Sequence, residues 1–207
     1  SGSGVSIKEI VEQIVNHLKD DREIIWDTSK PSGDALRLMD MTRAKKLMNF
    51  ETEVSLSDGI KMTMDWYMGN IESASNPYGF GAHERADWAS DLGVKVGEPA
   101  EYIYFVGCAA SFDERNQKVA RATIGLLKEA GLDVGILGMQ EGCSGDPARR
   151  AGNEYLFQML AETNMMTFQE LGVKRIVASC PHCFHTLGKE YADYGGADLE
   201  VFHHSEI

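Results

Sequence analysis

The spacing of apolar residues changes along the chain, and the change predicts alternating strands and helices between residues 102 and 178. Three short apolar runs, 102–106, 134–137 and 173–178, are typical of buried strands. Between them, apolar residues recur at helical offsets over 113–130 and 152–171. The second helical stretch carries its apolar residues at Tyr155, Leu156, Met159, Leu160 and Met166. Strands that alternate with helices form a parallel sheet, so this part of the chain is predicted to be an α/β domain.

The first third of the chain has a different pattern and is predicted to be a small, mainly helical α/β segment. It opens with an amphipathic stripe made of Ile7, Ile10, Val11, Ile14, Val15 and Leu18. Ser6 and Glu9 form the sequence signature of a capping box at the start of this helix. A strand is expected at 23–26, and two further helices are expected at 41–49 and 55–68.

Charge and hydropathy narrow the classes of function. The formal net charge is −12 over 207 residues, and both the segment before residue 76 and the remainder are acidic. Nucleic-acid binding requires a basic surface, so no nucleic-acid partner is expected. No apolar run approaches the roughly 20 residues that cross a bilayer. The chain is therefore predicted not to span a membrane and, because it shows no secretory signal, to be cytoplasmic.

Four cysteines carry the most specific signal in the chain: Cys108, Cys143, Cys180 and Cys183. Between the first and the second lie 34 residues, and between the second and the third lie 36. A cysteine follows each of the three predicted strands, and parallel strands end at a common edge where ligand sites lie. The four thiols are therefore expected to meet at the carboxyl edge of the sheet.

Converging thiolates have several chemical uses, and the residues alone leave these uses open. Thiolates are ligands for soft metals and for iron–sulfur clusters, which take about four cysteine sulfurs. Zinc also accepts four thiolates in tetrahedral geometry. The structural alternatives are free cysteines that pack as small apolar residues and disulfides, which need an oxidising compartment.

Five stretches, three of which contain the cysteines, form specific sequence motifs. They are 76–81 (NPYGFG), 85–89 (RADWA), 106–113 (VGCAASFD), 142–155 (GCSGDPARRAGNEY) and 180–183 (CPHC). Together, over about residues 76–207, they resemble the cysteine-rich CCG domain of heterodisulfide reductase-like iron–sulfur oxidoreductases. The resemblance implies a parallel-type α/β domain in which the four cysteines hold a cluster. It also implies electron transfer inside a larger assembly, with a flavoprotein or a further iron–sulfur protein as redox partner.

The middle motif departs from the family pattern. The family has Cys-Cys-Gly there, whereas this chain has Cys143, Ser144 and Gly145. A full five-cysteine set in this family can hold a non-cubane cluster, and four cysteines match the ligand count of a cubane. The sequence therefore favours a [4Fe-4S] cluster, with Gly107, Gly142 and Gly145 allowing the backbone to approach it closely.

Other polar residues near the motifs have two interpretations. Four histidines invite a metal-binding role: His182, His185, His203 and His204. A structural role is favoured for all of them, because the cysteines already complete a ligand set and the last two are expected at a strand edge. Asp146, Arg149 and Arg150 open a helix. There they either guide a redox partner or an anionic substrate, or form a cap and a solvated face.

The segment before residue 71 carries motifs of another family. They lie at 6–10, 26–33, 38–40, 55–60 and 66–67, and they resemble the C-terminal part of GDP-L-fucose synthase. That family implies a Rossmann glycine loop and a Tyr-x-x-x-Lys pair, and this sequence has neither. The segment is therefore expected to be structural, with a remnant of a GDP-sugar epimerase-reductase as the weaker alternative.

Two resemblances in one chain lead to the predicted domain organisation. Residues 1–4 are expected to be a tag or linker remnant, 5–70 the fucose-synthase-like fragment, 71–100 a connecting segment and 101–207 the CCG-type domain. Pieces of two unrelated families joined in this way indicate a recombined or engineered chimera. A zinc-binding or metal-free structural module without catalysis is the alternative function of such a chain.

Overall fold

The computed structural model divides into two compact units. It describes residues 4–19, 23–30, 33 and 38–207. Unit 1 runs from Ser1 to Trp66 and unit 2 from Tyr67 to Ile207. The predicted tag or linker remnant at 1–4 lies, apart from Gly4, outside the described residues.

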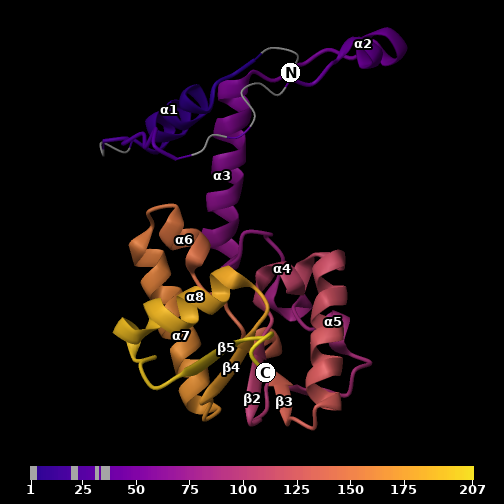
Figure 1. Ribbon diagram of the computed structural model, residues 1–207, viewed down its shortest axis with the longest axis vertical. Coiled ribbons are helices and arrows are strands. Elements are labelled where there is room, and N and C mark those ends of the chain that lie inside the picture. The colour runs from indigo at the N-terminus through magenta and orange to yellow at the C-terminus, as the bar shows by residue number, and fades with distance from the viewer. Residues whose placement is uncertain (1–3, 20–22, 31–32, 34–37) are drawn as a thin grey trace. The chain divides into compact units, whose positions relative to one another are not determined.

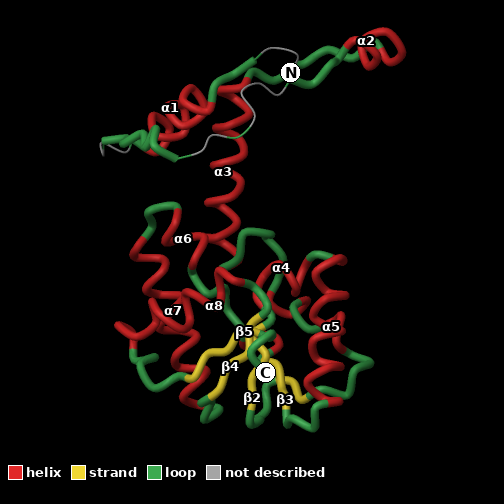
Figure 2. Tube along the Cα trace, in the orientation of Figure 1, coloured by secondary structure: helices red, strands yellow, loops and turns green. Residues whose placement is uncertain are grey.

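Unit 2 is built on a five-stranded parallel sheet in the order β1-β3-β2-β4-β5. The strands are β1 (Lys95–Val96), β2 (Tyr102–Phe105), β3 (Val134–Ile136), β4 (Arg175–Ala178) and β5 (Glu200–His203). The three apolar runs form β2, β3 and β4, and the predicted α/β fold class is confirmed. Figure 2 shows the strands side by side between the helices of unit 2.

Helices cover both faces of this sheet (Figure 1). The long helices are α5 (Glu114–Glu129), α7 (Glu154–Glu170) and α8 (Pro181–Lys189), and the short ones are α4 (Gly107–Phe112) and α6 (Asp146–Arg150). Four 3-10 turns complete the unit: η1 (Ala82–Glu84), η2 (Asp87–Ala89), η3 (Gly138–Gln140) and η4 (Glu190–Tyr194). The helices predicted at 113–130 and 152–171 are confirmed as α5 and α7. Asp113 caps α5 by accepting a hydrogen bond from the backbone of Asn116 at 2.9 Å.

Side chains of the central strands alternate between two apolar layers. Tyr104, Val106 and Val177 pack in one layer with Ile124 and Leu127 of α5. The neighbouring residues Ile103, Phe105, Ile176 and Ala178 pack in the other layer, with Phe157 and Phe168 of α7 and Leu187 of α8. Successive side chains of a strand point to opposite faces, so both faces of β2 and β4 are buried. This double burial explains why these strands are continuous apolar runs in the sequence.

The buried face of α7 differs from the stripe that the sequence indicated. Tyr155, Met159 and Met166 are 76%, 46% and 61% exposed. The buried residues of the helix are instead Phe157, Leu160, Ala161, Asn164, Met165 and Phe168. Apolar residues occupy more than one side of α7, and packing against the sheet selects which side is covered.

Unit 1 contains the predicted helices but not the predicted strand. The helices are α1 (Ile7–Leu18), α2 (Thr42–Met48) and α3 (Leu56–Ala74), the last of which ends in unit 2. The capping box is present: the Glu9 amide donates to the Ser6 hydroxyl at 3.1 Å, and the Ser6 amide donates to the Glu9 carboxylate at 2.7 Å. Residues 23–26 have irregular backbone, with Ile25 84% exposed. The strand prediction is wrong, because this short run pairs with no strand among the described residues.

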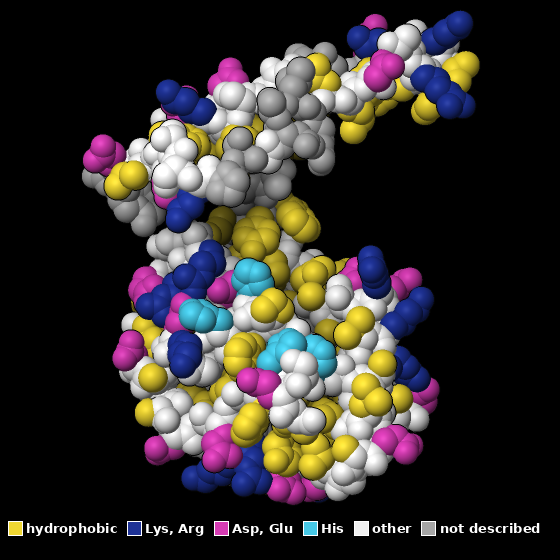
Figure 3. Space-filling view, viewed as in Figure 1, with side chains coloured by type: hydrophobic (Ala, Val, Ile, Leu, Met, Phe, Trp, Pro, Cys, Tyr) yellow, Lys and Arg dark blue, Asp and Glu magenta, His cyan; other side chains and the backbone are white. Residues whose placement is uncertain are grey.

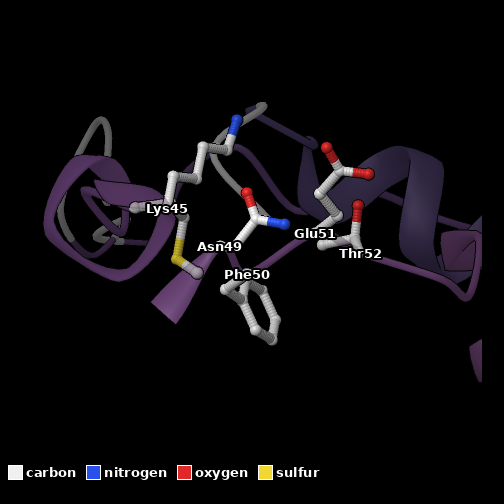
Figure 4. Close-up of a pocket in the computed structure, with 6 residues that line it drawn as sticks. Lys45, Asn49, Phe50, Glu51 and Thr52 are labelled. Carbon is white, nitrogen blue, oxygen red and sulfur yellow. The ribbon is translucent and has the colours of Figure 1, made fainter. Parts of the chain in front are cut away.

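Unit 1 buries little of its own apolar surface. None of the residues of α1 and α2, all of which are described, is buried. A hollow of about 320 Å³ is lined by Met41, Lys45, Asn49, Phe50, Glu51 and Thr52, and Figure 4 draws these residues. The Phe50 ring points away from the amine of Lys45 in this hollow. None of the six residues that line this hollow carries a thiol or an imidazole.

Residues 71–100 fold as part of unit 2. Ile71, Asn76, Arg85 and Trp88 are all less than one-tenth exposed. The same stretch provides the edge strand β1. The boundary predicted near residue 70 stays a prediction from similarity. Across the described part of the chain, no helix combines the length and apolar character that crossing a membrane requires.

Substitutions on α5 test which face of the helix meets the sheet. Ile124→Ala is expected to lower the free energy of unfolding by about 2–5 kcal/mol, because it empties a fully buried position. Leu126→Ala is the matched control: this side chain is 72% exposed, so its loss should cost less than about 0.5 kcal/mol. Urea unfolding followed by circular dichroism measures both. Equal losses would contradict the orientation of α5.

Candidate cysteine site at the carboxyl edge of the sheet

All four cysteines lie where the chain leaves the carboxyl end of a strand. Cys108 is in α4, shortly after β2, and Cys143 is in the loop that follows β3. Cys180 precedes α8, and Cys183 lies in the first turn of that helix, after β4. Since β2 lies between β3 and β4 in the sheet, the three loops are neighbours at one edge.

The four thiols line one cavity of about 440 Å³. Cys108, Cys143 and Cys183 are 8%, 3% and 7% exposed, and Cys180 is half-buried. All four are free thiols, so no disulfide accounts for them. Much of the remaining lining is apolar or aromatic and includes Tyr67, Pro77, Tyr78, Val106, Val119, Pro147 and Pro181.

The thiols are coupled in two pairs by hydrogen bonds. A bond from the Cys143 thiol, aided by the nearby Arg85, lowers the pKa of Cys108. The same bond and then burial raise the pKa of Cys143. In the second pair, a bond from Cys183 lowers the pKa of Cys180 to about 6, while that bond and burial raise the pKa of Cys183. Within each pair, the pKa of one thiol is therefore lowered and that of the other is raised.

The three glycines that were predicted to let the backbone approach a cluster have different neighbours. Gly107 has φ of 74°, and a Cβ on it would lie 3.2 Å from the sulfur of Cys183. Gly142 faces Asn164 instead, and a Cβ on Gly145 would lie 2.6 Å from the ring of Phe157. The missing side chain of Gly107 thus leaves space for a cysteine sulfur. Gly142 and Gly145 make room for the packing of α7.

Two buried polar residues that the sequence reasoning missed hold the loop around Cys143. Asn164, on α7, accepts from the Gly142 amide at 2.9 Å and donates to the Cys143 carbonyl at 2.9 Å. It also donates to the hydroxyl of Tyr191, which in turn donates to the Ser144 carbonyl at 3.0 Å. Burial raises the pKa of Tyr191, so its hydroxyl stays a donor. A signal existed in the sequence, because Asn164 is a polar residue on the buried face of an apolar helix.

Ser144 lies at the cavity, at the position where the family has a second cysteine. Its side chain lines the cavity and the residue is 2% exposed. The Ser144 hydroxyl is hydrogen-bonded to Cys183, which acts to lower the pKa of that thiol against the larger opposite effects of Cys180 and burial. The serine is therefore a polar neighbour of a sulfur atom rather than a surface residue.

A buried ion pair lies behind Cys108. Arg85 and Glu141 are 4% and 3% exposed, and an Nη of Arg85 lies 2.6 Å from Oε1 of Glu141. Burial alone would lower the pKa of Arg85, but the charges of Glu141 and Cys108 outweigh it and hold the guanidinium charged. Arg85 opens the motif at 85–89, and Glu141 directly precedes the motif at 142–155. The sequence did not reveal their pairing, because the two residues are 56 positions apart.

The polar residues at the start of α6 bind other parts of unit 2. The buried carboxylate of Asp146 accepts from Nε of Arg150 at 2.9 Å and lies 3.1 Å from Nδ1 of His182. Glu190 pairs with Arg149 at 3.2 Å and also with Arg150. Asp146 does not cap α6, since Gly145 occupies that position. Figure 3 shows acidic, basic and histidine side chains together on this face of unit 2.

The histidines do not join the cysteines in a single-ion site. Among the described residues, no three or more His, Cys, Asp or Glu side chains are grouped so as to hold one metal ion. His203 ends β5 and His204 follows it; the centroids of their rings lie 4.2 Å apart, with the ring planes tilted by 54°. The four cysteines, by contrast, line a single cavity together.

Comparisons with known proteins find similarity over the part of the chain that carries the four cysteines. The family model described as a cysteine-rich domain (CCG) matches residues 102–188. An EtfAB:quinone oxidoreductase of Syntrophomonas wolfei is 43% identical over 146 residues, which cover 67% of this chain and 20% of that protein. A probable iron–sulfur-binding oxidoreductase of Bacillus subtilis is 39% identical over 174 residues, 78% of this chain and 24% of that protein.

A relative of lower identity is a subunit of a heterodisulfide reductase, the kind of enzyme that the cysteine motifs resemble. It is one of the subunits of the dihydromethanophenazine:CoB–CoM heterodisulfide reductase of Methanosarcina mazei, and it is 29% identical over 137 residues, 64% of this chain and 33% of that protein. The chain thus spans about a fifth to a third of the length of these relatives. No solved structure matches the chain.

A second similarity is to a different family. A probable GDP-L-fucose synthase of Oryza sativa is 36% identical over 74 residues, 36% of this chain and 22% of that protein. The matches with the Bacillus and rice proteins together exceed the length of the chain, so the two similar regions overlap. Both predicted resemblances are confirmed: unit 2 carries the match to the CCG cysteine-rich domain, and a shorter stretch of the chain is similar to GDP-L-fucose synthase.

Proposed function

We propose that unit 2 binds an iron–sulfur cluster through Cys108, Cys143, Cys180 and Cys183 and passes electrons within a larger oxidoreductase. The observation that carries the proposal is the arrangement of four thiols, from three strand ends, around one cavity. Cysteine thiolates are the usual protein ligands of such clusters. The relatives support it, because one is named as iron–sulfur-binding and another belongs by name to a heterodisulfide reductase.

The residues at the cavity fit a cluster better than a single ion. A zinc site draws four sulfurs to within about 2.3 Å of one point, whereas the four thiols here line a cavity of about 440 Å³. A cluster occupies a volume and takes one sulfur at each iron, as four ligands around a cavity allow. Four ligands are the number that a [4Fe-4S] cubane uses, and we propose this type. When bound, the cluster supplies one-electron chemistry, and no side chain of the site is needed as a general base.

The partner in this proposal is a redox protein, either a flavoprotein or another iron–sulfur protein. Cys180 supports a contact from outside, because it is the half-buried member of the four. The chain spans only part of its relatives, and a fragment that accepts electrons needs a donor elsewhere. The proposed location is cytoplasmic, where thiols that are free and unbridged persist.

We infer that unit 1 has a structural role and that the chain combines two ancestries by recombination or design. The sequence lacks the Rossmann loop and the Tyr-x-x-x-Lys pair, and the hollow beside α2 offers no thiol or imidazole. The overlap of the two similar regions supports a junction inside the shared stretch rather than at one sharp border.

Replacing the paired cysteines tests the ligand assignment. Cys180→Ser and Cys183→Ser should each remove most of the cluster absorbance and iron after anaerobic reconstitution, because a neutral hydroxyl is a poor ligand for a soft metal. Ser179→Ala is the matched control, since Ser179 lines the same cavity without a thiol. Iron and sulfide analysis with visible absorbance measures the outcome. Parental iron content in both cysteine variants would refute the assignment, and a colourless parent that contains zinc would favour the structural-module alternative.

Restoring the family cysteine tests the position of Ser144. Ser144→Cys places a fifth thiol at the cavity, so reconstitution should change the electron paramagnetic resonance signal or the iron-to-protein ratio, whereas the parent should give a cubane-like signal. Ser90→Cys is the control, because it adds a thiol at an exposed position outside the cavity. If the Ser144 variant and the parent reconstitute identically, Ser144 has no influence on cluster type.

The fucose-synthase-like segment is expected to be inactive. Incubation with a GDP-4-keto-6-deoxy sugar and NADPH should give no NADPH oxidation above background, because the residues that bind the nicotinamide and transfer protons are absent from the sequence. Absorbance of NADPH over time measures the reaction. Turnover that scales with protein concentration would contradict the structural role of unit 1.

A further inference from the structure

We propose that Arg85 is a positioning residue for Cys108 and that the Arg85–Glu141 pair sets the reduction potential of the group that Cys108 binds. The inference rests on the proposed function, since it concerns the cluster at the four cysteines. The similarities to other proteins assign no role to either residue. Arg85 and Glu141 lie outside the set of thiols, and their contribution follows from the contacts that they make.

The guanidinium of Arg85 is enclosed in the protein next to its carboxylate partner. The side chains of Arg85 and Glu141 are 3% and 1% exposed, with 2.6 Å between Nη2 and Oε1. A buried ion pair costs desolvation energy that its own attraction repays only with further hydrogen bonds. Neutral residues of similar volume would fill the same space, so a retained pair points to a task beyond packing.

The further hydrogen bonds of Glu141 hold the turn before Cys108. Its Oε2 accepts from the Val106 amide at 2.9 Å, and its Oε1 accepts from the Gly107 amide at 2.8 Å. Three donors therefore satisfy the carboxylate: two amides from the turn and the guanidinium. This turn leads from β2 into α4, so the pair fixes the backbone from which the Cys108 thiol extends.

The guanidinium has a second acceptor, which is the sulfur of Cys108. Nη1 and Nη2 of Arg85 lie 3.8 and 4.0 Å from that sulfur. The guanidinium also lies over the Phe112 ring, 5.3 Å from its centroid. Arginine holds this arrangement because its planar fork presents several N–H donors at once, which a lysine ammonium does not reproduce.

Charge placed beside a cluster changes the energy of the added electron. Hydrogen bonds to the sulfurs and nearby charge are the means by which a protein tunes such a potential. A cation near Cys108 stabilises the reduced, more negative cluster, so Arg85 raises the potential. Glu141 has the opposite sign and partly offsets this effect. Because the guanidinium, and not the carboxylate, contacts the sulfur, the cation dominates.

The test is a set of single substitutions that separate charge from structure. Arg85→Gln removes the cation with a shorter side chain, and Glu141→Gln removes the anion with a side chain of the same length; both replacements still form hydrogen bonds. Arg121→Gln is the matched control, because Arg121 pairs with Asp91 away from the cysteines and its loss changes the net charge by the same unit. The full chain and each variant are reconstituted anaerobically with iron and sulfide. Potentiometric titration, followed by visible absorbance, then measures the midpoint potential.

The expected result is a pair of shifts of opposite sign. The potential should become more negative in Arg85→Gln, more positive in Glu141→Gln and unchanged in Arg121→Gln. A purely structural role predicts shifts in the same direction, or none, in the first two variants, and either result would overturn the inference.

If Arg85→Gln does not fold, Glu141→Gln alone decides: an upward shift of the midpoint potential supports the inference, and any other result contradicts it. A parent that holds no cluster contradicts the proposed function and this inference together, whereas a loaded parent with unshifted variants contradicts only this inference.

Discussion

The buried carboxylate of Glu141 is the interaction on which the cysteine edge depends. A negative charge that is 1% exposed at its side chain requires donors from the protein itself. It receives them from the amides of Val106 and Gly107 and from Arg85. Three segments distant in sequence are thereby joined: the turn after β2, the loop after β3 and the 3-10 segment before β1. The position of Cys108 follows from this network and not from β2 alone.

A second polar cluster plays a comparable part within the apolar layer of α7. Asn164 is fully buried among aromatic and aliphatic side chains. Its amide binds the loop that carries Cys143, together with the hydroxyl of Tyr191. An unpaired amide at this depth would be costly, so the loop and the helix must be in register. The packing of α7 on the sheet therefore helps to set the position of the Cys143 thiol.

The two units differ in how much structure their own residues can support. Unit 2 has two apolar layers with fully buried aromatic residues on both sides of a sheet. Unit 1 keeps large apolar side chains exposed, among them Ile7, Ile25, Met48 and Met62. Its α1 and α3 are tied by His17 and Asp65 at 2.9 Å, an exposed polar contact of modest strength. The apolar layers of unit 2 therefore hold most of the buried apolar side chains among the described residues.

The sequence by itself determined the three central strands β2, β3 and β4, the helices α5 and α7, and the edge at which the cysteines meet. Doubly buried strands are continuous apolar runs, and a parallel sheet sends the loops after its strands to one edge. It did not determine the buried side of α7, because several sides of that helix are apolar and only packing chooses among them. Nor did it reveal the Arg85–Glu141 pair or the contacts of Asn164, because those partners are 56 and 22 positions apart. Tertiary structure decided these pairings, because a buried charged or amide side chain forms hydrogen bonds with whichever polar groups the fold brings within about 3 Å.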